Sequence, residues 1–439
     1  MQLIRNISLT KKNLFSVLIA LFPLSFVAGN LLINLNIVLI ILFSLAIFKT
    51  EMFKLKFFFL DKILFSFFFL ILITAIYNDY YLYKKHDFLL FLETTLRSIL
   101  FLKYLLLYLS IRIIFLNNSI DLKLFFITSS FSVLFVSLDI IYQFYNGKDI
   151  FGFETIGQGR RLGGPFGDEL IAGGYLQRFS LFLFFLLPLF FKNFSDKYSK
   201  YLTPLLFIII LIGIILSGNR MPFILFIFSI TLILIFQKQA RKFLHYFVLL
   251  FFIIFFSIFN LNNEFKRGVG NFYGQISKMA VLIIEKDFNN ENAPAYLKEF
   301  SSFYDTWLLN KYIGGGIKNF RYYCHVKPNP ENKNYHCNMH PHNYYLEILT
   351  ETGVIGLLIV MAIFINLLFL TFYRKYFTKS SLSENNLIIP FIFLFFTEIF
   401  PLKSTGSFFT TGNTSYLFLI IGILIGLIRK ENSIENKYQ

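Results

Sequence analysis

The densest group of side chains suited to acid–base or metal chemistry lies between residues 324 and 351 of the 439-residue chain. It holds both cysteines and four of the six histidines, His325, His336, His340 and His342. After Pro341 apolar residues recur at helical spacing, so Asn343 is a predicted N-cap and His342 stands at the positive end of a helix. That field disfavours the imidazolium, and a neutral His342 can act as a general base. The alternative is a histidine that only caps or packs.

Arginines form a second group, beginning in a polar break between two apolar runs. Arg160 and Arg161 lead into a stretch that has seven glycines within residues 157–174. Glycines let backbone amides approach a ligand closely. Arg178 follows inside an apolar run, where an ionisable residue is a functional candidate by default. We expect these arginines to bind an anionic substrate, the alternative being a flexible hairpin whose arginines touch lipid phosphates.

Two carboxylates and one more arginine flank the histidines. Glu347 and Glu351 are four residues apart and therefore share one helix face near His342. Either can orient the base or bind a substrate hydroxyl, although a carboxylate that merely complements the helix N-terminus also explains Glu347. Arg321 is a further candidate anion ligand, against the alternative of a generally basic loop surface.

The composition indicates which elements position these residues. The chain is 56% hydrophobic and only 15% charged, whereas soluble proteins carry roughly 25% charged residues. Twelve apolar runs approach the length that crosses about 30 Å of hydrocarbon. They are 12–29, 31–48, 59–77, 94–115, 122–144, 172–191, 201–218, 220–236, 243–259, 345–373, 386–401 and 413–428. We therefore predict an all-α polytopic membrane protein with about twelve transmembrane helices and one large loop.

The excess of basic residues indicates orientation. The chain has 41 Lys and Arg against 25 Asp and Glu, a formal charge of +16. With the N-terminus inside, the predicted cytoplasmic segments hold 21 of these basic residues and the short outer loops hold 7. The positive-inside rule then places both termini in the cytoplasm and explains most of the charge without nucleic acid. The first run lacks a convincing small-residue cleavage site, so we interpret it as a retained helix.

This topology divides the chain into four predicted regions. Residues 1–259 form nine spans, 260–344 a large periplasmic loop, 345–428 three spans and 429–439 a cytoplasmic tail. Cys324 and Cys337 both fall in the periplasmic loop, where an oxidising environment favours a disulfide worth about 3 kcal/mol in the chain-entropy model. The rival is a zinc site that adds His336 and His340, although the spacing matches no familiar zinc pattern.

Several short motifs resemble the O-antigen ligase and polymerase superfamily of bacterial membrane glycosyltransferases. His342 and Asn343, nine residues, and then Gly353-x-x-Gly356 resemble the ligase signature at the start of a late span. The turn GGGIKNF at 314–320 and LSGNRMPF around Arg220 resemble two further elements of the superfamily. So does the arrangement of about twelve spans with a large periplasmic loop ahead of the signature, which implies a glycosyltransferase C-like membrane fold.

The resemblance implies an inverting, metal-independent transfer of a glycan from an undecaprenyl-pyrophosphate carrier to an acceptor hydroxyl at the periplasmic face. His342 would accept the hydroxyl proton and Arg220 would neutralise the departing pyrophosphate, because a guanidinium binds phosphate oxygens in pairs. Arg160, Arg161, Arg178, Arg321, Asn343 and Glu347 are the expected substrate-binding residues. The implied location is the bacterial inner membrane, in contact with its lipids, and no cofactor is expected.

Two questions stay open at this point. The acceptor is the lipid A core for a ligase and a second carrier-linked glycan for a polymerase. The HN signature favours the ligase, whereas the arginine-rich stretch at 157–174 favours the polymerase. A polysaccharide or lipid transporter is the more distant alternative, but transporters gather polar groups at the membrane midplane. Here the polar clusters lie near one predicted face.

Overall fold

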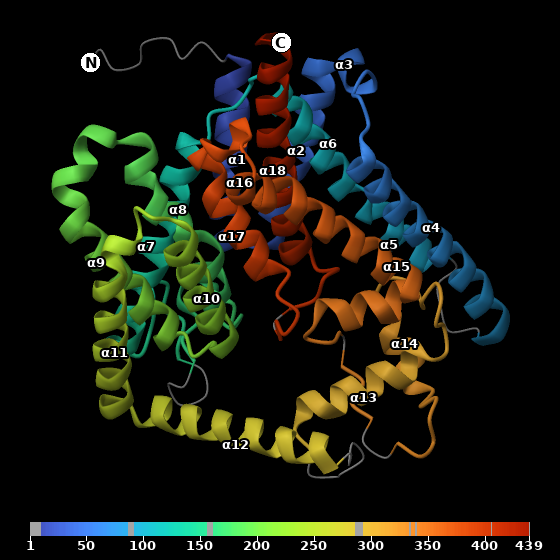
Figure 1. The fold of residues 1–439 in the computed structure, drawn as a ribbon. Coiled ribbons are helices and arrows are strands. Elements are labelled where there is room, and N and C mark those ends of the chain that lie inside the picture. Colours follow the sequence, from blue (N-terminus) through green and yellow to red (C-terminus); the bar gives the residue numbers. More distant parts are fainter. Residues whose placement is uncertain are drawn as a thin grey trace.

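The computed structural model describes residues 10–86, 92–155, 161–285, 293–332, 335–338, 340–404 and 406–438. Within these ranges the chain is helical, with an isolated bridge between Lys148 and Glu154 in place of any strand. Figure 1 shows that α1 begins and α18 ends at the same end of the molecule.

Nine helical segments of the described chain are long and apolar enough to cross a membrane. They comprise α1 (Lys11–Ala28), α2 (Asn30–Phe48), α4 (Phe59–His86), α5 (Glu93–Phe101) with α6 (Lys103–Leu116), α7 (Lys123–Asn146), α8 (Ala172–Phe190), α11 (Leu244–Leu261), α15 (Tyr344–Leu368) and α18 (Thr411–Tyr438). The apolar stretches of α9 (Lys192–Leu216), α10 (Arg220–Phe236) and α17 (Ile389–Glu398) are shorter. All twelve predicted runs therefore lie in helices, and the all-α polytopic class is confirmed. Twelve membrane crossings stay a prediction.

The centre of the bundle is α18. Its membrane-length part is apolar on all sides and is largely buried, as expected for a helix surrounded by other helices. Glycines let α6 approach it: a Cβ on Gly426 would lie 2.5 Å from the Phe115 ring, and one on Gly422 would lie 3.0 Å from Ile111. Small residues at such contacts allow the close packing on which helix association in membranes depends.

The helix α15 is broken near its start, where a continuous span was predicted. Gly353 has φ 69° and ψ −173°, far from helical values. Residues 311–316 lie along the break and exchange four backbone hydrogen bonds of 2.8–3.1 Å with residues 350–355. These bonds pair the backbone amides and carbonyls that lose their helical partners at the break. Non-helical backbone needs such partners wherever it lies within a bilayer. Both predicted glycine motifs meet here, and together they fix the first two turns of α15.

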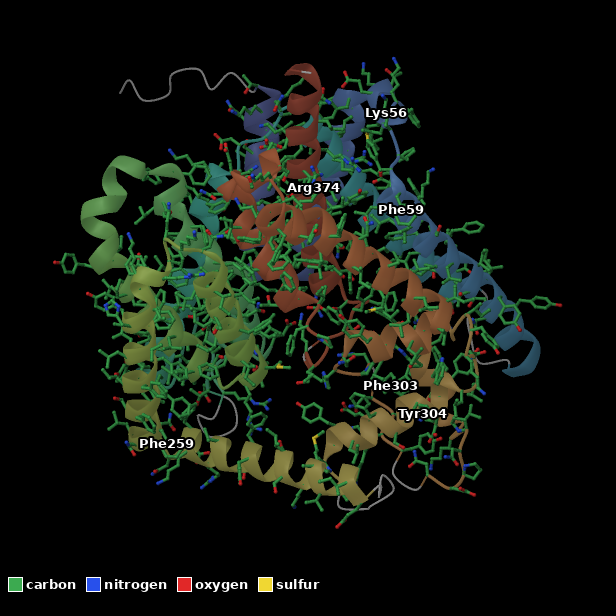
Figure 2. The ribbon with its side chains drawn as sticks, viewed as in Figure 1. Lys56, Phe59, Phe259, Phe303, Tyr304 and Arg374 are labelled. Atoms are coloured by element: carbon green, nitrogen blue, oxygen red, sulfur yellow. A yellow bond between two sulfur atoms is a disulfide. The ribbon has the colours of Figure 1, made fainter. Side chains whose placement is uncertain are left out.

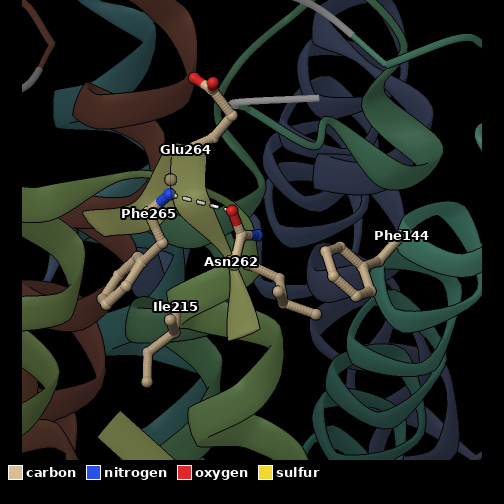
Figure 3. Close-up of a pocket in the computed structure, with 7 residues that line it drawn as sticks. Phe144, Ile215, Asn262, Glu264 and Phe265 are labelled. Atoms are coloured by element: carbon tan, nitrogen blue, oxygen red, sulfur yellow. Dashed lines mark hydrogen bonds between the residues drawn. The ribbon is translucent and has the colours of Figure 1, made fainter. Parts of the chain in front are cut away.

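The segment between α11 and α15 forms α12 (Asn263–Glu285), α13 (Ala295–Trp307) and α14 (Phe320–His325). Figure 1 shows α12 running across the end of the molecule opposite to the end of α18. Asn262 starts α12 by accepting a hydrogen bond from the Phe265 amide at 3.0 Å (Figure 3). The hollow beside this corner measures about 20 Å³ and is too small for a substrate group.

The smaller helices occur at the ends of the longer ones. They are α3 (Thr50–Phe53), α16 (Arg374–Phe377) and the short turns η1 (Gly164–Phe166), η2 (Arg241–Phe243), η3 (Phe369–Tyr373), η4 (Ser381–Ser383) and η5 (Asn386–Ile388).

Candidate functional site

The predicted general base lies directly before α15. Asn343 caps this helix: its side-chain oxygen accepts hydrogen bonds from the amides of Tyr345 and Leu346 at 3.0 and 3.2 Å. Its side-chain nitrogen donates to the Pro401 carbonyl at 2.8 Å. The residue after His342 is therefore held on both sides, which fixes the backbone that carries the imidazole.

The two neighbouring histidines favour the neutral form. Burial lowers the pKa of His342 below its ordinary value of 6.5. Burial also lowers the pKa of His340, and repulsion from a protonated His342 and from the charges of Lys318 and Arg321 lowers it further. The two imidazole rings lie 5.3 Å apart between centroids. A neutral imidazole at this position has the protonation state of a base ready to accept a proton.

A buried charge cluster lies behind the capped end of α15. Arg178 on α8 binds Glu398 through two hydrogen bonds of 2.7 and 3.1 Å, and Lys403 binds the same carboxylate at 2.6 Å. The Tyr344 hydroxyl also donates to Glu398, at 2.5 Å. Burial lowers the pKa of Lys403 to about 8 against the opposing effect of Glu398. The cluster therefore ties α8, α15 and the segment after α17 together.

Arg178 is thus a bridging residue as well as a predicted substrate ligand. A further hydrogen bond of 2.6 Å joins its guanidinium to Asn413 at the start of α18. Two other charged residues that fall within the apolar run 94–115 have separate partners. Arg97 pairs with Glu93 on the same helix, and Lys103 donates to Asn34 at 2.6 Å.

Glu347 faces the loop after α17 in addition to lying in the first turn of α15. Its two oxygens accept from the Ser407 hydroxyl and the Phe408 amide, both at 2.5 Å. Glu351, one turn later, is equally buried and is within electrostatic reach of Lys318 and Arg321. Glu347 therefore attaches α15 to the loop after α17. The sequence had suggested a substrate ligand or a carboxylate that complements the helix N-terminus, and neither interpretation included this contact.

Arg220 begins α10 and faces a hollow against α12. Its guanidinium donates to Gln275 at 3.2 Å and lies 5.2 Å from the centre of the Phe272 ring. The hollow measures about 340 Å³ and is lined by Arg220, Gly270, Asn271, Gly274, Gln275 and Lys278. A Cβ at Gly270 or Gly274 would meet no atom within 4 Å, so this face of α12 is open.

Lys278 is a candidate that the sequence did not single out. Gly270, Gly274 and Lys278 recur every four residues, which puts them on one face of α12. With Arg220 opposite, two cations and two amide side chains converge on one hollow. This combination suits a phosphate-bearing ligand.

The two parts of the candidate site share a support. On α10, which starts at Arg220, the ring of Phe228 packs against that of Phe400 just after α17, and the two centroids are 5.2 Å apart. The next residue, Pro401, accepts the hydrogen bond from Asn343. Residues 400 and 401 therefore contact both α10, which begins at Arg220, and the cap of α15, which follows His342.

The glycine-rich stretch has a packing role in the described residues. The amide of Gly164 donates to the Gln143 side chain at 2.9 Å, and a Cβ on Gly164 would lie 2.9 Å from Ile140. These contacts bring η1 against α7, which explains the glycine without a ligand. Arg161 is exposed, and Arg160 lies outside the described residues.

The remaining predicted residues lie around α14. Arg321 is half-buried, and its guanidinium donates to the Lys318 carbonyl at 3.1 Å. Cys324 and Cys337 are joined in a disulfide. The rival zinc site needs these sulfurs as free thiolates, so the disulfide contradicts it. Cys324 packs with Phe303 and Phe320 in a small apolar cluster, which anchors the chain that leads to His342.

Residues 205–361 match the O-antigen ligase family. This range includes Arg220, α12, the segment 311–316 and His342, so both halves of the candidate site lie within it. No curated protein matches the chain.

Proposed function

We propose that this protein, whose residues 205–361 match the O-antigen ligase family, moves a glycan from an undecaprenyl-pyrophosphate carrier to an acceptor hydroxyl at the periplasmic face. The family supports a membrane glycosyltransferase of this general kind. The observation that supports the proposal is a hollow lined by Arg220 and Lys278 in a chain whose His342, directly before α15, has a lowered pKa.

The proposed reaction divides the work between these groups. An imidazole nitrogen of His342 takes the proton of the acceptor hydroxyl as its oxygen forms a bond to the anomeric carbon. The bond between that carbon and the pyrophosphate oxygen breaks, and the electron pair leaves with the pyrophosphate. Arg220 and Lys278 stabilise the negative charge that develops there. Attack opposite the leaving group inverts the anomeric centre, and these cations do the neutralising work without a metal.

The surrounding residues have supporting roles in this proposal. Asn343 and Glu347 hold the start of α15, and Arg178 holds the end of α17 through Glu398. Arg321 and Arg161 are candidates to contact the glycan or pyrophosphate from the outer side. We further propose that the protein lies in the bacterial inner membrane with both termini in the cytoplasm. The regions 1–259, 260–344, 345–428 and 429–439 keep the topology inferred from the charges.

A reconstituted transfer assay tests the proposal. Purified protein is mixed with carrier-linked glycan and offered either lipid A core or a second carrier-linked glycan. We expect transfer to one acceptor and its loss in His342→Ala and Arg220→Ala, each at normal membrane levels. His245→Ala and Arg241→Ala, near the start of α11, are matched controls that keep full activity.

The outcomes separate the alternatives. Transfer to lipid A core identifies a ligase, and chain extension of the second glycan identifies a polymerase. Full activity of His342→Ala would contradict the proposed base. Movement of the carrier across vesicles with no glycan transfer would contradict the enzyme and indicate a transporter.

A further inference from the structure

A second concentration of positive charge lies near the end of α18, away from the proposed catalytic residues. Arg112 on α6 is only 1% exposed, and its guanidinium lies 2.7 Å from Asp61 at the start of α4. The Asp61 carboxylate also accepts hydrogen bonds from the Tyr108 hydroxyl and the Phe58 amide. One carboxylate therefore serves a fully buried arginine and two other donors.

Arg429 also lies within electrostatic reach of this carboxylate. The guanidinium carbon of Arg429 on α18 lies 3.3 Å from the centre of the Phe58 ring, and that of Arg112 lies 6.0 Å from it. Arg374 and Arg112 are both close enough to act on Arg429, as is Asp61. The Nε atoms of Arg112 and Arg429 are buried, and neither meets a hydrogen-bond partner within the described chain. The cluster combines excess positive charge with unused donors.

The surface beside this cluster is apolar and exposed. Phe53 is 85% exposed and Phe59 is 67% exposed, while the exposed Lys56 lies between them in sequence. Figure 2 shows Lys56, Phe59 and Arg374 toward one end of the molecule and Phe259 toward the other. Aromatic side chains next to basic groups match the boundary between acyl chains and headgroups.

We propose that this cluster binds the phosphate of an anionic glycerophospholipid, with the acyl chains lying against Phe53 and Phe59. Guanidinium groups suit phosphate because their planar fork engages two oxygens at once. A lipid with net negative charge also balances the positive charges of Arg112 and Arg429, which face the single carboxylate of Asp61, whereas a zwitterionic lipid does not. Basic sites between helices on the cytoplasmic side are known to favour anionic headgroups. The proposed topology assigns this end of the bundle to that side.

Lipid titration of the full-length protein tests this assignment. Protein in neutral detergent receives phosphatidylglycerol, phosphatidylcholine or inorganic phosphate, while bound lipid is counted by native mass spectrometry and thermal unfolding is followed. We expect phosphatidylglycerol to bind more tightly than phosphatidylcholine and to raise the unfolding temperature. Arg429→Gln should lower the phosphatidylglycerol affinity about fivefold, the loss of one basic contact at an anionic surface.

Two variants keep the result interpretable. Arg241→Gln removes an arginine that donates to backbone carbonyls of residues 234 and 235, and it should leave the affinity unchanged. Lys56→Gln removes an exposed charge beside the cluster and should lower the affinity, even where Arg429→Gln fails to fold. Equal affinity for the two lipids, or unchanged affinity in the foldable cluster variants, overturns the proposal. Inorganic phosphate that competes with the lipid and stabilises equally would assign the site to free phosphate instead.

Discussion

Asn343 and Pro401 are joined by a hydrogen bond of 2.8 Å, so the residue that caps α15 is also attached to the segment that follows α17. The cap uses the side-chain oxygen of Asn343, and the attachment uses its nitrogen. One side chain thus serves two separable purposes directly beside His342.

Substitution of Asn343 can separate these purposes. Asn343→Asp keeps an oxygen that caps the helix but loses the donor to Pro401. We expect the transfer rate to fall about tenfold, because a small displacement of His342 from its productive position slows proton transfer. Asn343→Ala loses both and should also destabilise the protein by about 1 kcal/mol. Transfer rates and thermal unfolding of both variants check this. Equal transfer by Asn343→Asp and wild type would show that the Pro401 contact does not position the base.

The pH dependence of transfer should report the lowered pKa of His342. A general base works in its neutral form, so activity falls as the pH drops through its pKa. Because burial lowers this pKa, the acid limb should lie below the ordinary value of 6.5. A profile of kcat/KM against pH measures it. A midpoint at or above 6.5 would contradict a half-buried neutral base, and the residual activity of His342→Ala should lack this limb.

The buried cluster around Glu398 should dominate stability. Glu398→Gln leaves Arg178 and Lys403 next to each other without their carboxylate, and breaking a buried ion pair in this way costs about 3–5 kcal/mol. Lys403→Met in the same background should recover part of the loss, because it removes one uncompensated charge. Glu431→Gln is the control, since that carboxylate accepts one hydrogen bond from Asn385. Thermal unfolding in detergent gives all three values.

Filling the hollow opposite Arg220 should impair donor binding without unfolding the protein. Gly274→Leu places a side chain where a Cβ meets no atom within 4 Å, so the helix tolerates it while the hollow becomes smaller. We expect a higher KM for the carrier-linked donor. Gly268→Leu on the same helix also meets open space and lies outside the hollow, so its KM should be unchanged. Equal kinetics of the two variants would remove the hollow from the donor site.

The disulfide should stabilise the segment that leads to His342. Replacing Cys324 and Cys337 by serine should lower stability by about 3 kcal/mol in the chain-entropy model. Reductant should destabilise the wild type and leave the double variant unaffected. Thermal unfolding with and without reductant makes the comparison, and an unchanged wild type under reductant would contradict a stabilising disulfide.

The sequence predicted those features that depend on local order. Asn343 was identifiable as a cap because a polar residue precedes helical periodicity, and the twelve apolar runs were visible as hydrophobic length. Glu398 and Arg178 were both visible as charges within apolar runs. Their pairing was not predictable, because 220 residues separate them and any of several charges offered a partner.

Other parts of the site depend on shape that the sequence does not reveal. The break at Gly353 looked like the ordinary start of a span, since the residues after it are apolar and those before it fit the same helical spacing. In the sequence, Lys278 is indistinguishable from other surface lysines. Its role depends on the packing of α12, whose face with Gly270, Gly274 and Lys278 lies opposite Arg220. The glycines at 163–167 look suited to an anion, whereas the structure packs η1 against α7.

The break in α15 also has a consequence for biogenesis. Residues 311–316 are synthesised before α15, yet their backbone partners at 350–355 belong to it. The Ile313 and Gly314 carbonyls further accept from Thr74 and Asn78 on α4, at 2.9 and 3.1 Å. Residues 311–316 therefore cannot reach their final position until α4, which is made early, and α15, which is made later, are both in place. Assembly of this region is consequently a late, post-insertion event.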